Sequence, residues 1–228
     1  MPKNLPIQFV ETRGEQDVFL KEGGGGSELP KWVNKETITH NVTTMRTSLT
    51  VLGALFDARE ADGKDDLPLL AVATLHEKAT AKSYRANARG LFDGKRKRNV
   101  IGVDSPRDLL VKIDNKAELL RIARNYSPAA VAEAGKVKQF GLAIISNIHK
   151  YRPHIDEDLV GNPLKIRLID YQDNELNERS EILFLRKCEE QNLHVRKVNY
   201  AQDVRMFCVS EVQDNASIQA LATMDSVL

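Results

Sequence analysis

The last third of the chain, residues 164–228, constrains the fold most, because few architectures fit its order of apolar patterns. Apolar and charged side chains alternate from residue 164 to residue 168, which indicates a strand over residues 164–171 with one face on a core. A helical spacing follows, then two strand patterns at residues 194–200 and 204–212, and then a helical pattern that begins at Asp214. This order predicts a βαββα unit, which is a split βαβ unit without its fourth strand.

The same order of patterns occurs earlier in the chain and is complete there. Asn115 and Glu118 have the spacing of a capping box, so a helix is expected to start between the third and fourth strands of this earlier unit. A short helical piece starts at Ser127 and Pro128, and Gly135 is expected to stop it. The predicted strands are residues 67–76, 100–103, 109–113 and 140–145, and the first predicted helix is residues 81–91.

The part of the chain before these units combines a tail with a long helix. Four consecutive glycines within residues 22–27 leave the backbone almost unrestrained and predict a flexible hinge. Trp32 is expected to anchor the tail to the body, and Asn34 can cap the helix that follows. Apolar residues then recur at spacings of three and four through residues 38–56, which predicts a long amphipathic helix.

These patterns together predict an α+β protein with two tandem ferredoxin-like (βαββαβ) units, of which the second lacks its last strand. The expected divisions are a tail at 1–32, a long helix and first unit at 33–146, a linker at 147–163 and the incomplete unit at 164–228. In such units the helices cover one face of the sheet and leave the other exposed. Two open faces in one small protein indicate a binding protein, and residues beyond Leu228 or a partner are expected to complete the second sheet.

Composition excludes several broad classes. The 33 Lys and Arg residues balance 32 Asp and Glu residues, so no overall charge favours nucleic acid or an acidic membrane as a partner. The two cysteines, Cys188 and Cys208, fall on apolar patterns and are expected to be buried thiols, not a disulfide. No secretory leader pattern and no membrane-spanning apolar run is present, so we expect a cytoplasmic protein without a membrane partner.

Catalytic motifs are also missing from the sequence. His76 and Glu77 resemble the start of a zinc-protease helix, but the second histidine one turn later is absent. His149 and His154 lie near acidic residues, yet their spacing matches no pattern of metal ligands, and a solvated linker is the better interpretation. We therefore expect no metal, no cofactor and no enzymatic activity of the chain itself.

One concentrated basic run leaves an alternative function open. Nucleic-acid binding through this run is the first alternative, although the paired aromatic residues of an RNA-reading βαββαβ sheet are poorly matched here. A second alternative is a regulatory domain that senses a small molecule between its two units. The basic run consists of Lys95, Arg96, Lys97 and Arg98.

Two groups of segments resemble the N-terminal region of large intracellular bacterial subtilisin-like (S8 family) serine peptidases, including prophage-associated and phage-defence members. The first group is Leu-Pro-Ile-Gln-Phe at residues 5–9, the glycine run at 22–26 and Leu-Pro-Lys-Trp-Val at 29–33. The second is Asn-Val-Ile-Gly-Val at 99–103 with Leu-Leu-Val-Lys-Ile at 109–113. The resemblance extends to about residue 126.

The resemblance implies a propeptide-like role as a folding template or inhibitor of a subtilisin-like protease domain, in cis or in trans. Propeptides of that family are βαββαβ units whose open sheet docks on the protease and whose C-terminal tail lies in the substrate cleft. The Asp, His and Ser motifs of the catalytic triad are absent here, so no catalytic residue is assigned. The expected protease-binding residues are Lys165, Arg167, Arg205 and Phe207 on the open face, with Val227 and Leu228 in the tail.

Overall fold

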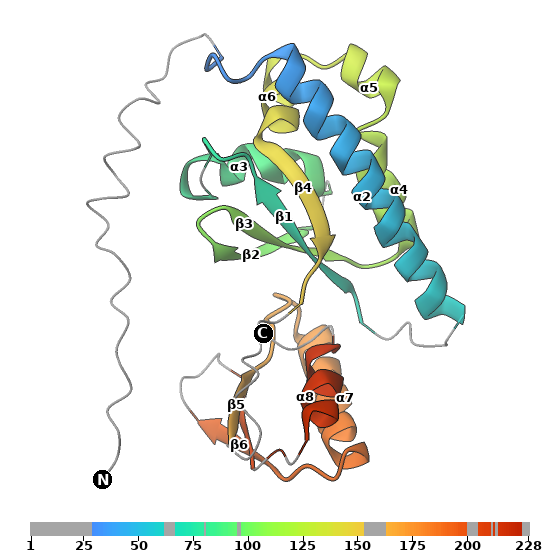
Figure 1. The fold of residues 1–228 in the computed structure, drawn as a ribbon, viewed down its shortest axis with the longest axis vertical. Coiled ribbons are helices and arrows are strands. Elements are labelled where there is room, and N and C mark those ends of the chain that lie inside the picture. Colours follow the sequence, from blue (N-terminus) through green and yellow to red (C-terminus); the bar gives the residue numbers. More distant parts are fainter. Residues whose placement is uncertain are drawn as a thin grey trace, which may run out of the picture.

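The computed structural model describes residues 29–61, 67–79, 81–94, 97–152, 163–199, 205–210, 212 and 214–224. Their helices and two antiparallel sheets confirm the predicted α+β class (Figure 1). Residues 1–28 of the predicted tail, which include the glycine hinge, lie outside these ranges. The first unit contains α2 (Lys35–Ala61), β1 (Leu69–Leu75), α3 (Ala81–Phe92), β2 (Val100–Ser105), β3 (Asp108–Ile113), α4 (Lys116–Arg124), α5 (Pro128–Ala132), α6 (Lys136–Ile144) and β4 (Ile145–Lys150).

The first sheet has four strands in the order β2-β3-β1-β4, and every neighbouring pair is antiparallel. Alternation along β1 separates its two faces. Leu69, Ala71 and Ala73 join the core beneath the helices, whereas Leu70 and Val72 belong to a separate cluster on the opposite face. The sheet is therefore apolar on both sides, although helices cover only one of them.

The long helix α2 forms as its apolar spacing predicts. Asn34 caps it, because the Thr37 backbone N–H donates to Asn34 Oδ1 at 2.9 Å. Figure 1 shows α2 lying along β4 and α4. Its inward stripe is fully part of the main core and consists of Val42, Met45, Leu49, Leu52 and Phe56. The helix therefore belongs to the first unit as an added layer.

The predicted fourth strand is wrong in position. Residues 140–144 belong to helix α6, and the strand that follows is β4, which extends to Lys150. A short apolar run does not by itself distinguish a buried strand from a buried helix, and here Leu142 and Ile144 are buried in the helix. Residues 147–150, which were assigned to the linker, consequently form part of the first sheet.

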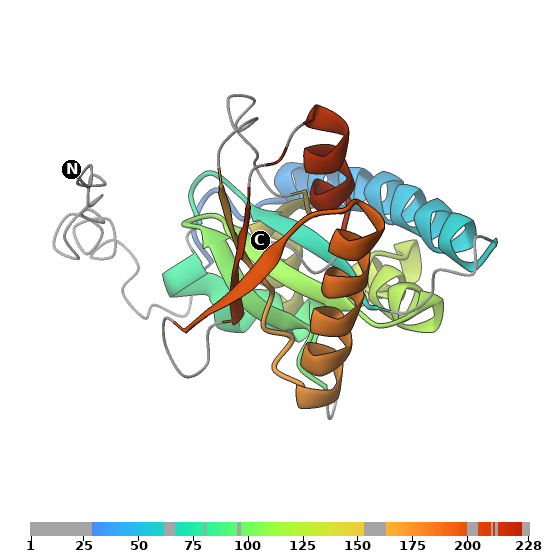
Figure 2. The same cartoon turned by 90° about the horizontal axis from the view of Figure 1, so that it is seen from below.

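The second unit follows the predicted order of elements. It contains β5 (Leu164–Arg167), α7 (Asn174–Glu190), β6 (Val195–Asn199), β7 (Arg205–Val209) and α8 (Asn215–Ala222). The strand order is β5-β7-β6, with both pairs antiparallel. The first three strands of the first unit are arranged in the same relative order. Helices α7 and α8 pack on one side of this sheet around Phe184 and Ile218 (Figure 2).

A third apolar cluster joins the two units and corrects the prediction of two open faces. Tyr171 is fully buried, and the amide nitrogen Nε2 of Gln172 donates to the backbone oxygen of Ile101 at 2.8 Å. Residues 169–176 thus cover apolar side chains on the face of the first sheet that lacks helices. The buried members of this cluster are Leu70, Val72, Ile101, Leu110, Tyr151, Ile169 and Tyr171.

Tyr126 has an unpartnered hydroxyl in the main core, and its removal is expected to stabilise the protein. The residue is 0% exposed, its hydroxyl has no hydrogen-bond partner among the described residues, and burial raises its pKa. Tyr126→Phe removes this buried polar atom and should raise the free energy of unfolding by about 1 kcal/mol. Urea denaturation followed by circular dichroism measures the change. A loss of stability would instead mean that the hydroxyl has a partner, such as a buried water.

Candidate protein-docking site

The second sheet has one face packed on helices and one face without a described helix. Direct pairing across the antiparallel strands assigns the side chains: Ile166 lies opposite Phe207 on the core face, and Lys165 lies opposite Cys208 on the other. Both helices of the unit belong to the core side. The face away from them, here called the open face, comprises Lys165, Arg167, Met206, Cys208, Arg196 and Val198.

The predicted docking residues divide between the two faces. Lys165 and Arg167 are exposed on the open face, as predicted. The placement of Arg205 and Phe207 on that face is wrong, because both lie on the core side of β7. Phe207 is 1% exposed and its ring lies 5.0 Å from that of Phe184. The remaining two candidates, Val227 and Leu228, lie outside the described residues.

Arg205 is a structural residue that holds the start of α7. Its guanidinium donates to Ser180 Oγ at 2.7 Å and to Asn177 Oδ1 at 2.9 Å, and also to the backbone oxygens of Asn177 and Ile169. Burial lowers its pKa, although Glu181 and Asp170 oppose the effect. The charge of Arg205 predicted an exposed side chain. Its guanidinium instead donates hydrogen bonds to acceptors within its own unit.

The open face combines a basic rim with a half-buried apolar centre. Lys165, Arg167 and Arg196 are exposed, whereas Met206 and Cys208 are half-buried between them. The neighbouring Lys197 points to the core side, where its Nζ lies 2.5 Å from Glu181 Oε1. Three cations around apolar atoms are suited to an acidic protein surface, since charge selects the partner and apolar contact adds affinity.

The outer edge of β5 has hydrogen-bonding groups that its neighbour does not use. Leu168 donates its N–H to the Arg205 carbonyl at 2.9 Å, which places the β7-facing groups at residues 164, 166 and 168. The N–H and C=O groups of Lys165 and Arg167 therefore point away from β7. Within the described ranges β5 pairs with β7 alone. Such an edge can accept a further strand.

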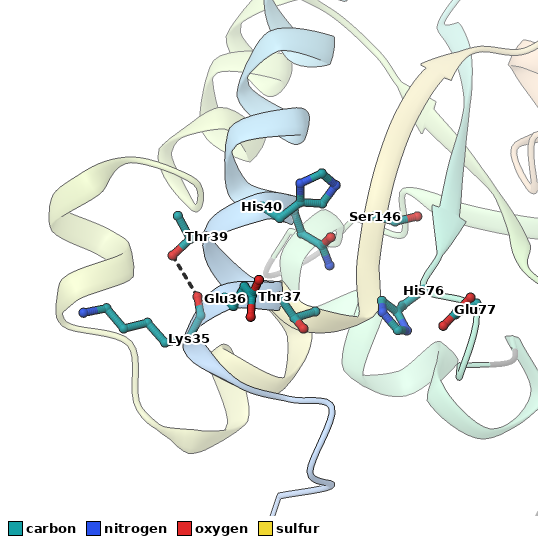
Figure 3. A pocket seen from close by; sticks show the side chains of 9 residues that line it. Lys35, Glu36, Thr37, Thr39, His40, His76, Glu77 and Ser146 are labelled. Carbon is teal, nitrogen blue, oxygen red and sulfur yellow. Dashed lines mark hydrogen bonds between the residues drawn. The ribbon is translucent and has the colours of Figure 1, made fainter.

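A groove of about 1030 Å³ lies at the start of α2, away from the second sheet. Figure 3 shows His40 on α2, Ser146 on β4, and His76 with Glu77 after β1. The Ser146 hydroxyl donates to the Thr74 carbonyl at 3.0 Å, so it is committed to the main chain. No group of three metal-binding side chains occurs in the described part of the chain. The groove thus shows neither an activated nucleophile nor a metal centre.

His76 instead completes an aromatic cluster that anchors the chain before α2, as predicted for Trp32. The rings of Trp32 and His76 are stacked with their centroids 4.8 Å apart, and Tyr84 and Phe140 pack around Trp32. The Lys78 N–H donates to His76 Nδ1 at 3.2 Å. Burial lowers the pKa of His76, and the nearby Lys78 also lowers it, against the opposing charge of Glu77.

The protein is therefore expected to lose stability as the pH falls below neutrality. Because the folded pKa of His76 is lowered, the unfolded chain binds a proton more readily, and the stabilisation present above a pH of about 6.5 is lost as the pH falls through the folded pKa. Thermal unfolding followed by Trp32 fluorescence should show a lower Tm at pH 5.5 than at pH 7.5, both being approximate ends of the histidine range. His76→Phe keeps the stacking and should reduce this difference. An undiminished difference in the variant would contradict the assignment.

In the basic run proposed for nucleic acid, Lys97 forms an ion pair at the surface of the first unit. Lys97 Nζ lies 2.8 Å from Asp114 Oδ2, and this contact raises the pKa of Lys97. Arg98 is exposed, whereas Lys95 and Arg96 lie outside the described residues. The run therefore differs from a set of four solvated cations, since one of its charges is held by the first unit.

Comparison with known proteins adds no assignment to this geometry. No protein-family model, no curated protein and no solved structure matches the chain. Within the residues that the structure describes, none of the helices is long and apolar enough to cross a membrane.

Proposed function

We propose that the chain is a non-catalytic, propeptide-like region that docks on a subtilisin-like serine protease domain, in cis or in trans, and regulates its folding or activity. The open face of the second sheet carries the proposal. None of its described residues belongs to an apolar cluster of the described part of the chain, and its rim is formed by Lys165, Arg167 and Arg196. In this role the helices α7 and α8 support the sheet from behind.

The arrangement of the two units supports a binding role for the second sheet. The first sheet packs against helices on one side, and residues 169–176 cover apolar side chains on its other side. The open face of the second sheet has both charged and apolar side chains, and none of them belongs to a core cluster of the described residues. A partner that contacts them can add apolar burial at Met206 and Cys208 and charge pairing at the rim. A role in phage defence belongs to this proposal through the family resemblance alone.

Inhibition of a subtilisin-like protease tests the proposal directly. The purified chain should bind the protease domain and slow its cleavage of a chromogenic peptide. The double variant Lys165→Glu/Arg167→Glu should weaken inhibition at least about tenfold, because two rim charges are reversed. Arg186→Glu is the matched control, since Arg186 is exposed on α7, on the other side of the sheet. A chain that neither binds nor slows the protease would refute the proposal.

A further inference from the structure

The outer edge of β5 and the basic side chains beside it define a more specific partner than the open face alone. Lys165 and Arg167 are the two residues of β5 whose main-chain groups point to the outer edge, and their side chains are the two that β5 places on the open face. The same two residues therefore provide main-chain hydrogen-bonding groups that are free within the described ranges, together with positive charges. A strand added at this edge can form hydrogen bonds with the main chain and ion pairs with the side chains of both residues.

The spacing of these residues determines the pattern of the added strand. In an antiparallel pair, residues directly opposite one another place their side chains on the same face. Residues opposite Lys165 and Arg167 therefore point to the open face, two positions apart, and acidic side chains there pair with the cations. The residue between them lies opposite Ile166 and points to the core side, where an apolar side chain extends the core.

The first unit contains an example of the same arrangement. Its strand β4 pairs antiparallel with β1, which holds the position in the first sheet that β5 holds in the second. Ile148 of β4 lies opposite Ala73 and enters the core, whereas its neighbours Asn147 and His149 are polar. A polar–apolar–polar segment is therefore a strand that this architecture already accepts at the corresponding edge.

We propose that the outer edge of β5 binds an extended acidic–apolar–acidic segment of a partner protein as an antiparallel fourth strand. The acidic side chains lie opposite Lys165 and Arg167, and the apolar side chain lies opposite Ile166. This inference rests on the proposed docking role of the second unit and adds the chemistry of the segment that is recognised. The two exposed cations favour an acidic segment at this edge, because opposite charges attract.

Peptide binding tests this inference without a protease. Fluorescence anisotropy with labelled Ser-Glu-Val-Glu-Val-Glu-Ser should show saturable binding that weakens with salt, whereas the peptide with lysine in place of glutamate should bind at least about tenfold more weakly. Lys165→Glu/Arg167→Glu should invert this preference, and Arg186→Glu should leave it unchanged. Methylation of the central glutamate nitrogen, which keeps the charge but removes a main-chain donor, should also abolish binding.

A backbone variant separates strand addition from charge pairing. The N–H of Lys165 faces the outer edge, so Lys165→Pro removes an edge donor without removing a hydrogen bond to β7. Binding should be lost in this variant and only reduced in Lys165→Ala, while circular dichroism shows that both remain folded. Equal binding by the proline and alanine variants would overturn strand addition.

Other outcomes would also overturn the inference. Equal binding of the acidic and basic peptides would exclude charge selection, and displacement of the acidic peptide by a single-stranded oligonucleotide with tighter binding would identify the rim as a nucleic-acid site. Peptide binding that appears only after deletion of residues 1–28 would assign the edge to the chain's own N-terminal segment. Protease inhibition without peptide binding would refute this inference alone, and peptide binding without protease binding would refute the proposed function alone.

Discussion

Replacing Tyr171 with alanine is expected to lower the free energy of unfolding by about 3–5 kcal/mol, the range for removal of a large aromatic side chain from a core. Tyr171 is 0% exposed and is one of the largest side chains in the cluster between the two units. Its loss leaves a cavity against Leu70 and Val72, while the cores of the two units remain intact. The variant should therefore uncouple the units as well as destabilise the protein.

Two spectroscopic signals can separate these effects. Trp32 lies in the first unit and reports its unfolding by fluorescence, whereas far-ultraviolet circular dichroism reports both units. In urea the two transitions should coincide for the wild-type protein and separate for Tyr171→Ala. Tyr171→Phe keeps the ring and should cost about 1 kcal/mol or less. Coincident transitions with little loss of stability in the alanine variant would show that the cluster does not couple the units.

Replacing Arg205 with alanine is expected to cost about 3 kcal/mol, because the variant loses the hydrogen bonds that one charged group donates to four acceptor atoms inside the second unit. Those acceptors belong to Ile169, Asn177 and Ser180, which hold the chain between β5 and α7. Arg205→Lys should recover only part of the loss, since an ammonium group cannot span the same acceptors as a planar guanidinium.

The effect of Arg205→Ala on binding distinguishes its structural role from the docking role first expected for it. Below its unfolding transition, the variant should bind the acidic peptide nearly as well as the wild-type protein, because Arg205 lies on the core side of β7. Hydrogen exchange should show faster opening at the start of α7. Unchanged stability with strongly reduced peptide binding would mean that Arg205 acts at the surface.

The corrections to the predicted fold concern the face of the sheet on which a side chain lies and whether a segment is a helix or a strand. In β7, residues 206–209 are all apolar, so alternation alone does not show which set faces the helices, and a shift of one residue exchanges the faces. The pairing of Ile166 with Phe207 shows that Phe207 and Val209 are the residues of β7 that face the helices. In the same way, the apolar run at residues 140–145 suits a buried strand or a buried helix, and in the structure residues 140–144 belong to α6, which packs against α3.

Local chemistry in the sequence by itself determined the caps, the long helix α2 and the order of elements in the second unit. Asn34, Asn115 and Asp214 each cap a helix through bonds that span three residues, so no distant contact is needed to predict them. Only the tertiary structure decided that residues 169–176 cover the first sheet, which face of β7 is open, and that Arg205 is internal. These features depend on strand register and on contacts between distant residues, which a single-sequence pattern does not specify.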